Sequence, residues 1–321
     1  MKNTNPTIIL TGFLGSGKTT YLNYLMKNSS NTRFAIIENE YGKESIDGDI
    51  ILSDEDDIVE LNNGCLCCTL NDNLYDILNR LYIRRAEYDQ LVIEATGMAD
   101  PRGIAAPFLT NPSVKKQFPL TAIVCLIDAE LIEDQLEETV EAIHQITYSD
   151  ILLLNKTDLV SKEYVKSLTQ KLKGLNPLAK IIAGNFGELS SVKSIHNFNK
   201  QFDLGSDDSS EEFPISSPYA HHHHHHTDVT THTFIYNEPF DLPKLKLRLM
   251  AFMMFQSKGL YRMKGLIGTK QSDRLHLIQS VGKRFAIDEM KKVNNGKKSK
   301  IIVIGKNLQR TGFENMFNQC Q

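Results

Sequence analysis

Residues 7–20 read TIILTGFLGSGKTT, and this stretch decides the fold. The β-branched and apolar residues at its start predict a buried strand, and GFLGSGKT follows at once with the spacing of a Walker A loop. Glycine at Gly12, Gly15 and Gly17 permits the backbone angles that turn the N–H groups of the loop toward an anion. The stretch therefore predicts a nucleoside triphosphate site between a strand and a helix.

The side chains of this loop have separate roles in the predicted site. Lys18 supplies a point charge for the β- and γ-phosphates, and Thr19 offers a hydroxyl to Mg²⁺. The helix that begins here adds the positive end of its dipole. We therefore expect Lys18 and Thr19 to act in catalysis. The residues expected to hold the nucleotide and its Mg²⁺ are Gly12, Gly15, Ser16, Gly17, Lys18, Thr19 and Thr20.

Length and composition limit the class of protein. A chain of 321 residues with 41% hydrophobic residues can bury a core in each of two domains. Lys and Arg (36) nearly balance Asp and Glu (39), so we expect neither nucleic acid nor a membrane as a partner. No apolar run reaches the roughly 20 residues of a membrane span, and residues 1–6 are not a signal peptide. We expect a cytoplasmic protein.

Apolar strands alternate with amphipathic helices from the Walker A loop to about residue 185. Strands are expected at residues 34–37, 91–93, 121–127, 151–154 and 180–183, and helical spacing of apolar residues marks 74–81, 136–146 and 165–172. Together with the P-loop, this alternation predicts the α/β class, with a mainly parallel sheet and its ligands at the carboxyl ends of the strands.

The composition changes near residue 204. Residues 205–227 hold Ser, Asp, Glu, Pro and six consecutive histidines, which predicts a flexible linker. A strand at 233–236, a helix at 242–255, two or three short strands and a helix at 308–317 then predict a smaller α+β domain. The expected domains are a P-loop GTPase domain at 1–204, a His-rich linker at 205–230 and a C-terminal domain at 231–321.

A second nucleotide motif, Asn155-Lys156-Thr157-Asp158, ends the expected strand 151–154. A buried carboxylate at Asp158 can accept from the ring N–H and the exocyclic amine of guanine, while Asn155 contacts the opposite side of the base. Adenine would leave that carboxylate unpaired, which is how a polar site rejects an analogue. Asn155, Lys156 and Asp158 are therefore expected nucleotide-binding residues, and GTP is the expected nucleotide.

Glu94 and Gly97 directly follow the expected strand 91–93. Most GTPases carry Asp at the first of these positions, where it holds Mg²⁺ through water, and glycine at the second, whose N–H meets the γ-phosphate. Glu94 is one methylene longer and can do the same work. We expect Glu94 to be catalytic and Gly97 to contact the nucleotide.

Three of the five cysteines, Cys65, Cys67 and Cys68, lie within four residues. In a reducing compartment such a cluster indicates metal binding or redox chemistry, and thiolates suit Zn²⁺ or Cu(I). One short loop rarely completes four-coordination, so a carboxylate from Glu38 or Glu40 is a candidate further ligand. Buried small hydrophobic residues or a redox pair are the alternatives for the thiols.

Two other groups of residues can bind metals. The histidines at 221–226, near His232, would chelate Zn²⁺, Ni²⁺ or Co²⁺ without forming a fixed site, and an inserted purification tag is the alternative explanation. Met250, Met253 and Met254 occur at helical spacing among Leu and Phe, so we expect them to fill the core.

Five segments resemble one family when they are taken in order. TGFLGSGKTT, IENEYGKESIDG, ELNNGCLCC, LVIEATGMADP and LLNKTDLV resemble the CobW-type metallochaperone GTPases, P-loop proteins with a GCxCC metal motif. RMKGLIG and KIIVIGKNL are similar to segments of the C-terminal domain of that family. The resemblance covers nearly the whole chain, and GCxCC between the Walker A loop and ExxG is its most specific element.

The resemblance implies a GTPase domain whose nucleotide state is coupled to a metal site, with the metal handed to a client protein. It also implies that Cys65, Cys67 and Cys68 are thiolate ligands, with Glu38 or Glu40 as a carboxylate partner.

One position departs from the family pattern. Members often have Glu after the glycine of NE(F/Y)G, whereas Lys43 follows Gly42 here. A cation replaces an acidic ligand, which weakens the case for a second carboxylate from this loop.

The sequence thus predicts a GTPase that binds a transition metal and transfers it in a nucleotide-dependent way. Zn²⁺ is the favoured metal, with Co²⁺ and Ni²⁺ as alternatives. No catalytic Gln or Arg finger is evident, so intrinsic hydrolysis should be slow. A P-loop kinase or ligase for a small molecule and a metal storage or sensing module remain open. The client protein is not identified, and a homo-oligomer is one open alternative for the assembly.

Overall fold

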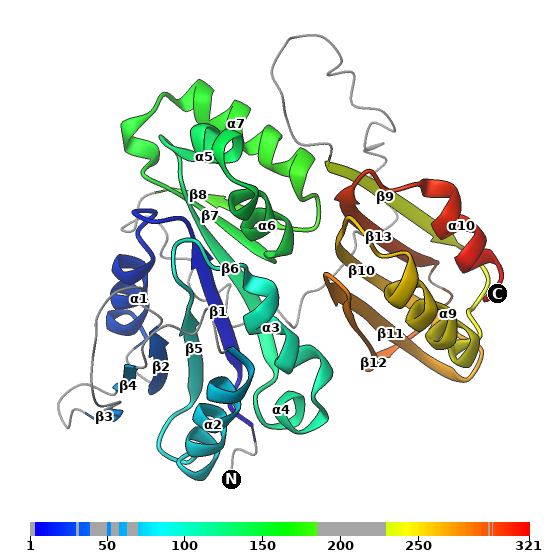
Figure 1. Ribbon diagram of the computed structural model, residues 1–321, viewed down its shortest axis with the longest axis horizontal. Helices are drawn as coiled ribbons and strands as arrows, with labels where there is room; N and C mark the ends of the chain where they lie inside the picture. The colour runs from blue at the N-terminus through cyan, green and yellow to red at the C-terminus, as the bar shows by residue number, and fades with distance from the viewer. Residues whose placement is uncertain are drawn as a thin grey trace.

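The computed structural model describes residues 4–29, 32–38, 50–52, 58–62, 70–184, 229–294, 296 and 298–321. Within these ranges the chain forms two sheets, each with its own helices and core (Figure 1). The expected linker at 205–230 falls almost entirely outside the described residues. The strand that follows it begins at Val229, earlier than the expected domain start at residue 231.

The first sheet has eight strands in the order β3-β4-β2-β5-β1-β6-β7-β8. All neighbouring strands are parallel except β3 and β4, which confirms the expected mainly parallel sheet. The strands are β1 (Thr7–Gly12), β2 (Phe34–Glu38), β3 (Ile50–Leu52), β4 (Ile58–Asn62), β5 (Gln90–Glu94), β6 (Leu120–Asp128), β7 (Ile151–Asn155) and β8 (Lys180–Ala183).

Helices pack on both faces of this sheet. Alternate residues of β1 explain why: Ile8 and Leu10 join the core under α1, whereas Ile9 joins the core under α2 and α3. No helix in the described part of the chain is long and apolar enough to cross a membrane. The helices are α1 (Lys18–Lys27), α2 (Leu70–Ile83), α3 (Pro101–Thr110), α4 (Pro112–Gln117), α5 (Ile132–Glu138), α6 (Val140–Tyr148), the 3₁₀ turn η1 (Thr157–Leu159) and α7 (Lys162–Leu175).

The single helix expected across 136–146 is wrong, because the structure has two helices there. Thr139 is extended, with φ −136° and ψ 140°, and separates α5 from α6. Its hydroxyl accepts a hydrogen bond from the Ala142 N–H, so it is the N-cap of α6. The apolar spacing continues across the break, which is why periodicity alone did not reveal it.

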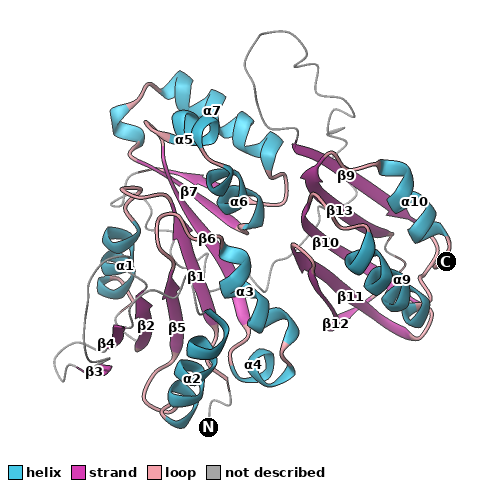
Figure 2. Cartoon of the chain, viewed as in Figure 1, coloured by secondary structure: helices cyan, strands magenta, loops and turns pink. Residues whose placement is uncertain are grey.

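The second sheet is antiparallel, in the order β12-β11-β10-β13-β9, and two helices pack on it (Figure 2). The expected smaller α+β architecture is confirmed, although four strands rather than two or three follow the first helix. These elements are β9 (Val229–Tyr236), α9 (Leu242–Phe255), β10 (Leu260–Thr269), β11 (Ser272–Val281), β12 (Arg284–Val293), β13 (Ser299–Lys306) and α10 (Arg310–Asn318).

The expectation that three methionines of α9 fill the core is correct only for Met253. Met250 and Met254 are 52% and 69% exposed. The buried stripe of the helix consists of Leu245, Leu249, Phe252 and Met253, which leaves the other two methionines on the opposite side.

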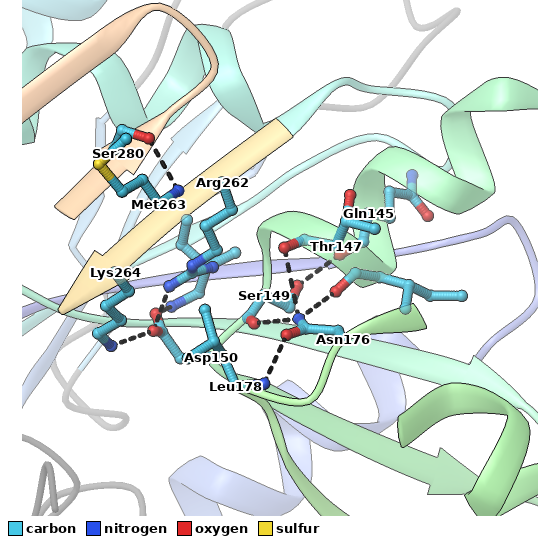
Figure 3. Close-up of polar contacts among 12 residues, drawn as sticks. Gln145, Thr147, Ser149, Asp150, Asn176, Leu178, Arg262, Met263, Lys264 and Ser280 are labelled. Atoms are coloured by element: carbon cyan, nitrogen blue, oxygen red, sulfur yellow. Dashed lines mark hydrogen bonds and ion pairs between the residues drawn. The ribbon is translucent and has the colours of Figure 1, made fainter. Parts of the chain in front are cut away.

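The two sheets are joined by a buried ion cluster (Figure 3). Arg262 and Lys264 are two residues apart on β10, so their side chains leave the same face of the strand and reach Asp150 at the start of β7. Lys264 Nζ is 2.8 Å from Asp150 Oδ1, Arg262 forms a short ion pair with the same oxygen, and the Ile123 N–H donates to Oδ2 at 2.9 Å.

This cluster has two cations and one carboxylate, and its groups respond differently to burial. Burial alone would raise the pKa of Asp150, but Arg262 and Lys264 outweigh it and lower that pKa to about 2. Burial lowers the pKa of Lys264 despite the attraction of Asp150. The carboxylate is therefore held in its charged form by the two cations that contact it.

Candidate nucleotide and metal site

The Walker A loop has the backbone that its glycines make accessible. Gly12, Gly15 and Gly17 have φ values of 140°, 77° and 97°. A Cβ on Gly12 would lie 2.3 Å from the Leu126 carbonyl oxygen, so a side chain there would clash with β6. Gly17 is the N-cap residue of α1, and the loop therefore leads directly into the positive end of that helix.

Lys18 lies over this loop. Its Nζ donates to the carbonyl oxygens of Gly12 at 2.8 Å and Phe13 at 3.2 Å. Burial lowers the pKa of Lys18, and the nearby Glu94 carboxylate opposes that shift. The hydroxyl of Ser16 is buried and has no hydrogen-bond partner among the described residues. The loop thus combines a cation with an unsatisfied polar atom, as expected for a site that takes a polar ligand.

The carboxyl end of β5 meets this loop. Thr19 Oγ1 donates to Glu94 Oε1 at 3.0 Å, and Glu94 is buried. A hydroxyl and a carboxylate in contact supply the hard oxygen ligands that Mg²⁺ prefers. Gly97 lies close to the loop, since a Cβ on it would be 2.7 Å from the Leu14 nitrogen. Thr20 is exposed on the first turn of α1.

The Asn155-Lys156-Thr157-Asp158 motif lies at the end of β7, two strands away from β1. Asn155 is buried, and its Nδ2 donates to the Ser16 carbonyl oxygen at 3.0 Å. Lys156 has a φ of 57°, and its Nζ is 2.7 Å from Asp128 Oδ2. The expectation of a buried carboxylate is wrong for Asp158, which is exposed on η1 because that turn projects beyond the sheet.

The strand register brings the ends of β2 and β4 to the same edge of the sheet. Glu38 at the end of β2 is paired with Glu94 on one side and with Asn62 at the end of β4 on the other. Neighbouring strands are about 4.8 Å apart, so the end of β4 lies roughly 10 Å from Glu94. Residues 63–69, which contain the three cysteines, directly follow Asn62.

Most of the predicted metal ligands lie outside the described residues. Only the backbone of Glu38 is described, and no group of three or more His, Cys, Asp or Glu side chains that could hold a metal occurs in the described ranges. His232 lies in β9, with Nε2 3.0 Å from the Leu308 carbonyl oxygen, so it is engaged within the second sheet. The predicted residues outside the described ranges are Glu40, Cys65, Cys67, Cys68 and the histidines at 221–226.

Gln145 on α6 is a residue of this site that the sequence analysis missed. Its Nε2 donates to the carbonyl oxygens of Gly97 at 3.1 Å and Ala99 at 3.3 Å, and the side chain is 2% exposed. It therefore holds the backbone that follows β5. The one sequence signal for Gln145 was a polar residue beside the apolar stripe of α6. Its partners could not be identified from this signal, because they lie far away in the sequence.

The helix that carries Gln145 also contacts the second sheet. The rings of His144 and Tyr261 on β10 pack edge to face, with centroids 5.0 Å apart. His144 Nδ1 is 3.2 Å from the carboxylate of Asp100, the N-cap residue of α3. Burial tends to raise the pKa of Asp100, but bonds from His144 and Arg102 lower it to about 2. Residues 95–100, the Gly97 segment, thus lie between the Walker A loop and the boundary of the two sheets.

Known proteins resemble the chain over nearly its whole length. Residues 6–183 match the family model described as the CobW/HypB/UreG nucleotide-binding domain, and residues 229–321 match the cobalamin synthesis protein cobW C-terminal domain. The zinc-regulated GTPase metalloprotein activator 1 of Schizosaccharomyces pombe is 30% identical over 351 residues, which cover 95% of this chain and 83% of that protein. The zinc chaperone YjiA of Escherichia coli is 30% identical over 286 residues, 87% of each chain.

A solved structure confirms the architecture. The crystal structure of Zn(II)-bound YjiA GTPase from Escherichia coli superposes with a TM-score of 0.71, at 24% identity and over 99% of both chains. At this identity the similarity supports the fold alone.

Proposed function

The chain belongs to the CobW/HypB/UreG family of nucleotide-binding proteins, and on that premise we propose that it is a GTP-hydrolysing metallochaperone that delivers Zn²⁺ to a client protein. The observation that carries the proposal is the shared sheet edge, where the Walker A loop, Glu94 and Asn155 meet and where β4 ends at Asn62, the residue before the cysteine segment in the sequence. The relatives named as zinc chaperones and as a zinc-regulated GTPase metalloprotein activator support it.

The nucleotide half of the proposal uses residues of the described site. Lys18 would move from its loop carbonyls onto the β- and γ-phosphates, and Asn155 with Asp158 would read guanine. Thr19 and Glu94 would hold Mg²⁺, which neutralises phosphate charge when it is bound. Because no Gln or Arg is positioned in sequence to stabilise the transition state, hydrolysis is slow without metal or partner.

The metal half of the proposal assigns Zn²⁺ as cargo. Cys65, Cys67 and Cys68 supply thiolates, and Glu38 supplies a carboxylate from the neighbouring strand end. Three thiolates and one oxygen ligand suit Zn²⁺. Co²⁺ and Ni²⁺ could bind the same ligands, and the metal bound in cells would also depend on which metal is available. In the sequence only residues 63–69 separate the end of β4 from the start of α2, which supports a metal site near the nucleotide edge.

The two halves are coupled through the segment after β5. A γ-phosphate that binds the Gly97 N–H would fix this segment, and hydrolysis would release it. Gln145 acts here as a positioning residue, since it holds the carbonyls of Gly97 and Ala99. Zn²⁺ and GTP affinities should therefore be linked reciprocally.

The division of the chain remains part of this proposal. Residues 1–204 form the GTPase domain, 205–230 the linker and 231–321 the C-terminal domain, in keeping with one sheet within 7–183 and the other within 229–306. A cytoplasmic location is supported by Cys125 and Cys320, which are buried free thiols.

The nucleotide specificity is tested with Asp158→Asn. An amide in place of the carboxylate loses the acceptor for the guanine amine, so GTP affinity should fall about a hundredfold while xanthosine triphosphate gains affinity. Asp134→Asn, at another exposed aspartate of the same domain, is the matched control and should change neither affinity. Titrations with GTP, ATP and xanthosine triphosphate measure these affinities for the unmodified chain and both variants. Preference of the unmodified chain for ATP would refute the proposal and favour a small-molecule kinase or ligase.

A further inference from the structure

The solvent side of α9 carries an apolar stripe. Leu247 is 69% exposed and Phe255 is 83% exposed, and the exposed Met250 and Met254 lie between them on the same helix. Leu247, Met250 and Met254 follow one another at intervals of three and four residues, so they form a ridge over two turns. Phe255 points about 100° away from Met254 and flanks the C-terminal end of this ridge. The four residues together are named the α9 stripe, which is about 12 Å long at 1.5 Å per residue.

The stripe is not the face by which α9 packs on its own sheet. The opposite side of the helix is buried with Leu249 and Phe252 in the core of the second sheet. A surface helix of a globular domain is normally polar over its solvent side, whereas the solvent side of α9 also carries this apolar stripe. A contiguous exposed apolar patch of this kind marks an interaction site.

Cations surround the stripe. Lys244, Lys246, Arg248 and Lys258 are all exposed, and residues 242–255 contain no Asp or Glu. Lys244 is 3.7 Å from Asp241, and the other three form no ion pair with a carboxylate in the described ranges. The stripe is therefore apolar at its centre and positively charged at its rim.

The position of α9 leaves the stripe accessible. Figure 1 shows α9 and α10 together on one side of the second sheet and the first sheet with its helices on the other side. The contacts between the two units involve β9, β10, β11 and β12 instead. A partner seated on α9 would therefore leave the nucleotide site and the Asp150 cluster undisturbed.

We propose that the α9 stripe docks an acidic amphipathic helix of the client protein, an inference that rests on the proposed function for the role of that partner. A ridge with this spacing matches apolar anchors repeated every three or four residues on a partner helix. Methionine side chains adapt to differing apolar partners, which suits recognition of a surface helix. The cationic rim selects partners with Asp or Glu beside their apolar anchors, because complementary charge gives specificity.

The test uses the full chain and two synthetic helical peptides. Both peptides carry the same Leu and Phe stripe, and they differ in having Glu or Lys at every flanking position. In fluorescence anisotropy the Glu peptide should bind, the Lys peptide should bind at least about tenfold more weakly, and added salt should reduce the difference. The double variant Leu247→Ser, Met254→Ser should lose about tenfold in affinity for the Glu peptide. Ile83→Ser, at an exposed apolar residue of α2, should lose nothing.

Three results would overturn the proposal. Equal binding of both peptides would indicate an unspecific apolar surface, and binding of neither would remove the site. Self-association of the chain that disappears in the double variant would assign the stripe to a second copy. GTP turnover and Zn²⁺ binding are measured on the same samples and should be unchanged. A chain that binds the Glu peptide but lacks GTP turnover would refute the proposed function and leave the docking site intact.

Discussion

Replacement of Asp150 by Asn should destabilise the chain strongly, because it removes the buried carboxylate charge that Arg262 and Lys264 both contact. The drop in the pKa of Asp150 from 3.8 to about 2 corresponds to about 2–3 kcal/mol, at about 1.36 kcal/mol per pH unit. Removal of one partner from a buried ion pair costs about 3–5 kcal/mol in general. We therefore expect Asp150→Asn to lower the free energy of unfolding by about 3 kcal/mol or more.

Urea unfolding at neutral pH measures this loss, and Lys264→Met is its matched control. Lys264 is a cation whose pKa burial already lowers, and its removal leaves the pair of Asp150 with Arg262 intact. Lys264→Met should lower the free energy of unfolding by less than half as much as Asp150→Asn does. The reasoning is refuted if Asp150→Asn costs under about 1 kcal/mol, a typical loss for a single hydrogen bond.

The pH dependence provides a second check on the same residue. The folded pKa of Asp150 is depressed, so its stabilisation is complete above the unfolded pKa near 3.8 and is lost as the pH falls through about 2. The unmodified chain should therefore lose stability between about pH 4 and pH 2, and Asp150→Asn should lack this part of the loss. Equal slopes of the two proteins across that window would mean that Asp150 is not the group responsible.

Three substitutions in the nucleotide site have distinct expected outcomes. Gly12→Ala places a methyl 2.3 Å from the Leu126 carbonyl oxygen at a φ of 140°, and should cost about 1–3 kcal/mol in a thermal melt and abolish GTP binding. Thr19→Ala removes a proposed Mg²⁺ ligand and should raise the Mg²⁺ concentration for half-maximal turnover about tenfold. Gln145→Leu should lower the ratio of GTP-analogue to GDP affinity about fivefold in calorimetry. A lower melting temperature with an unchanged ratio would show that Gln145 only supports α6.

Strands that are buried on both faces could be predicted from the sequence. β6 and β7 are almost uninterrupted apolar runs, because helices cover both sides of the sheet. β3 and β4 have only three and five residues, and β4 includes Glu60 and Asn62, so neither strand has a readable period. β12 is rich in Lys, Asp and Glu, and its pairing with β11 rather than its composition makes it a strand.

In the candidate site too, features set by the local sequence could be predicted, whereas features set by tertiary packing could not. Residues in contiguous motifs could be named because loop, strand end and helix start are adjacent in the chain, as at Lys18 and Asn155. Gln145 could not be assigned, since its acceptors are 48 and 46 residues away and depend on how α6 packs. The exposure of Asp158 likewise depends on the direction of η1, which the local sequence does not specify.

The central claim, a nucleotide-gated Zn²⁺ site, is tested most directly by measuring Zn²⁺ affinity against a chromophoric chelator. Affinity is compared with a GTP analogue, with GDP and without nucleotide, in the chain lacking residues 221–226 and in its Cys67→Ser variant. We predict a tight site that Cys67→Ser removes and whose affinity differs at least about fivefold between the GTP analogue and GDP. An affinity that is the same in all three nucleotide conditions would contradict the account.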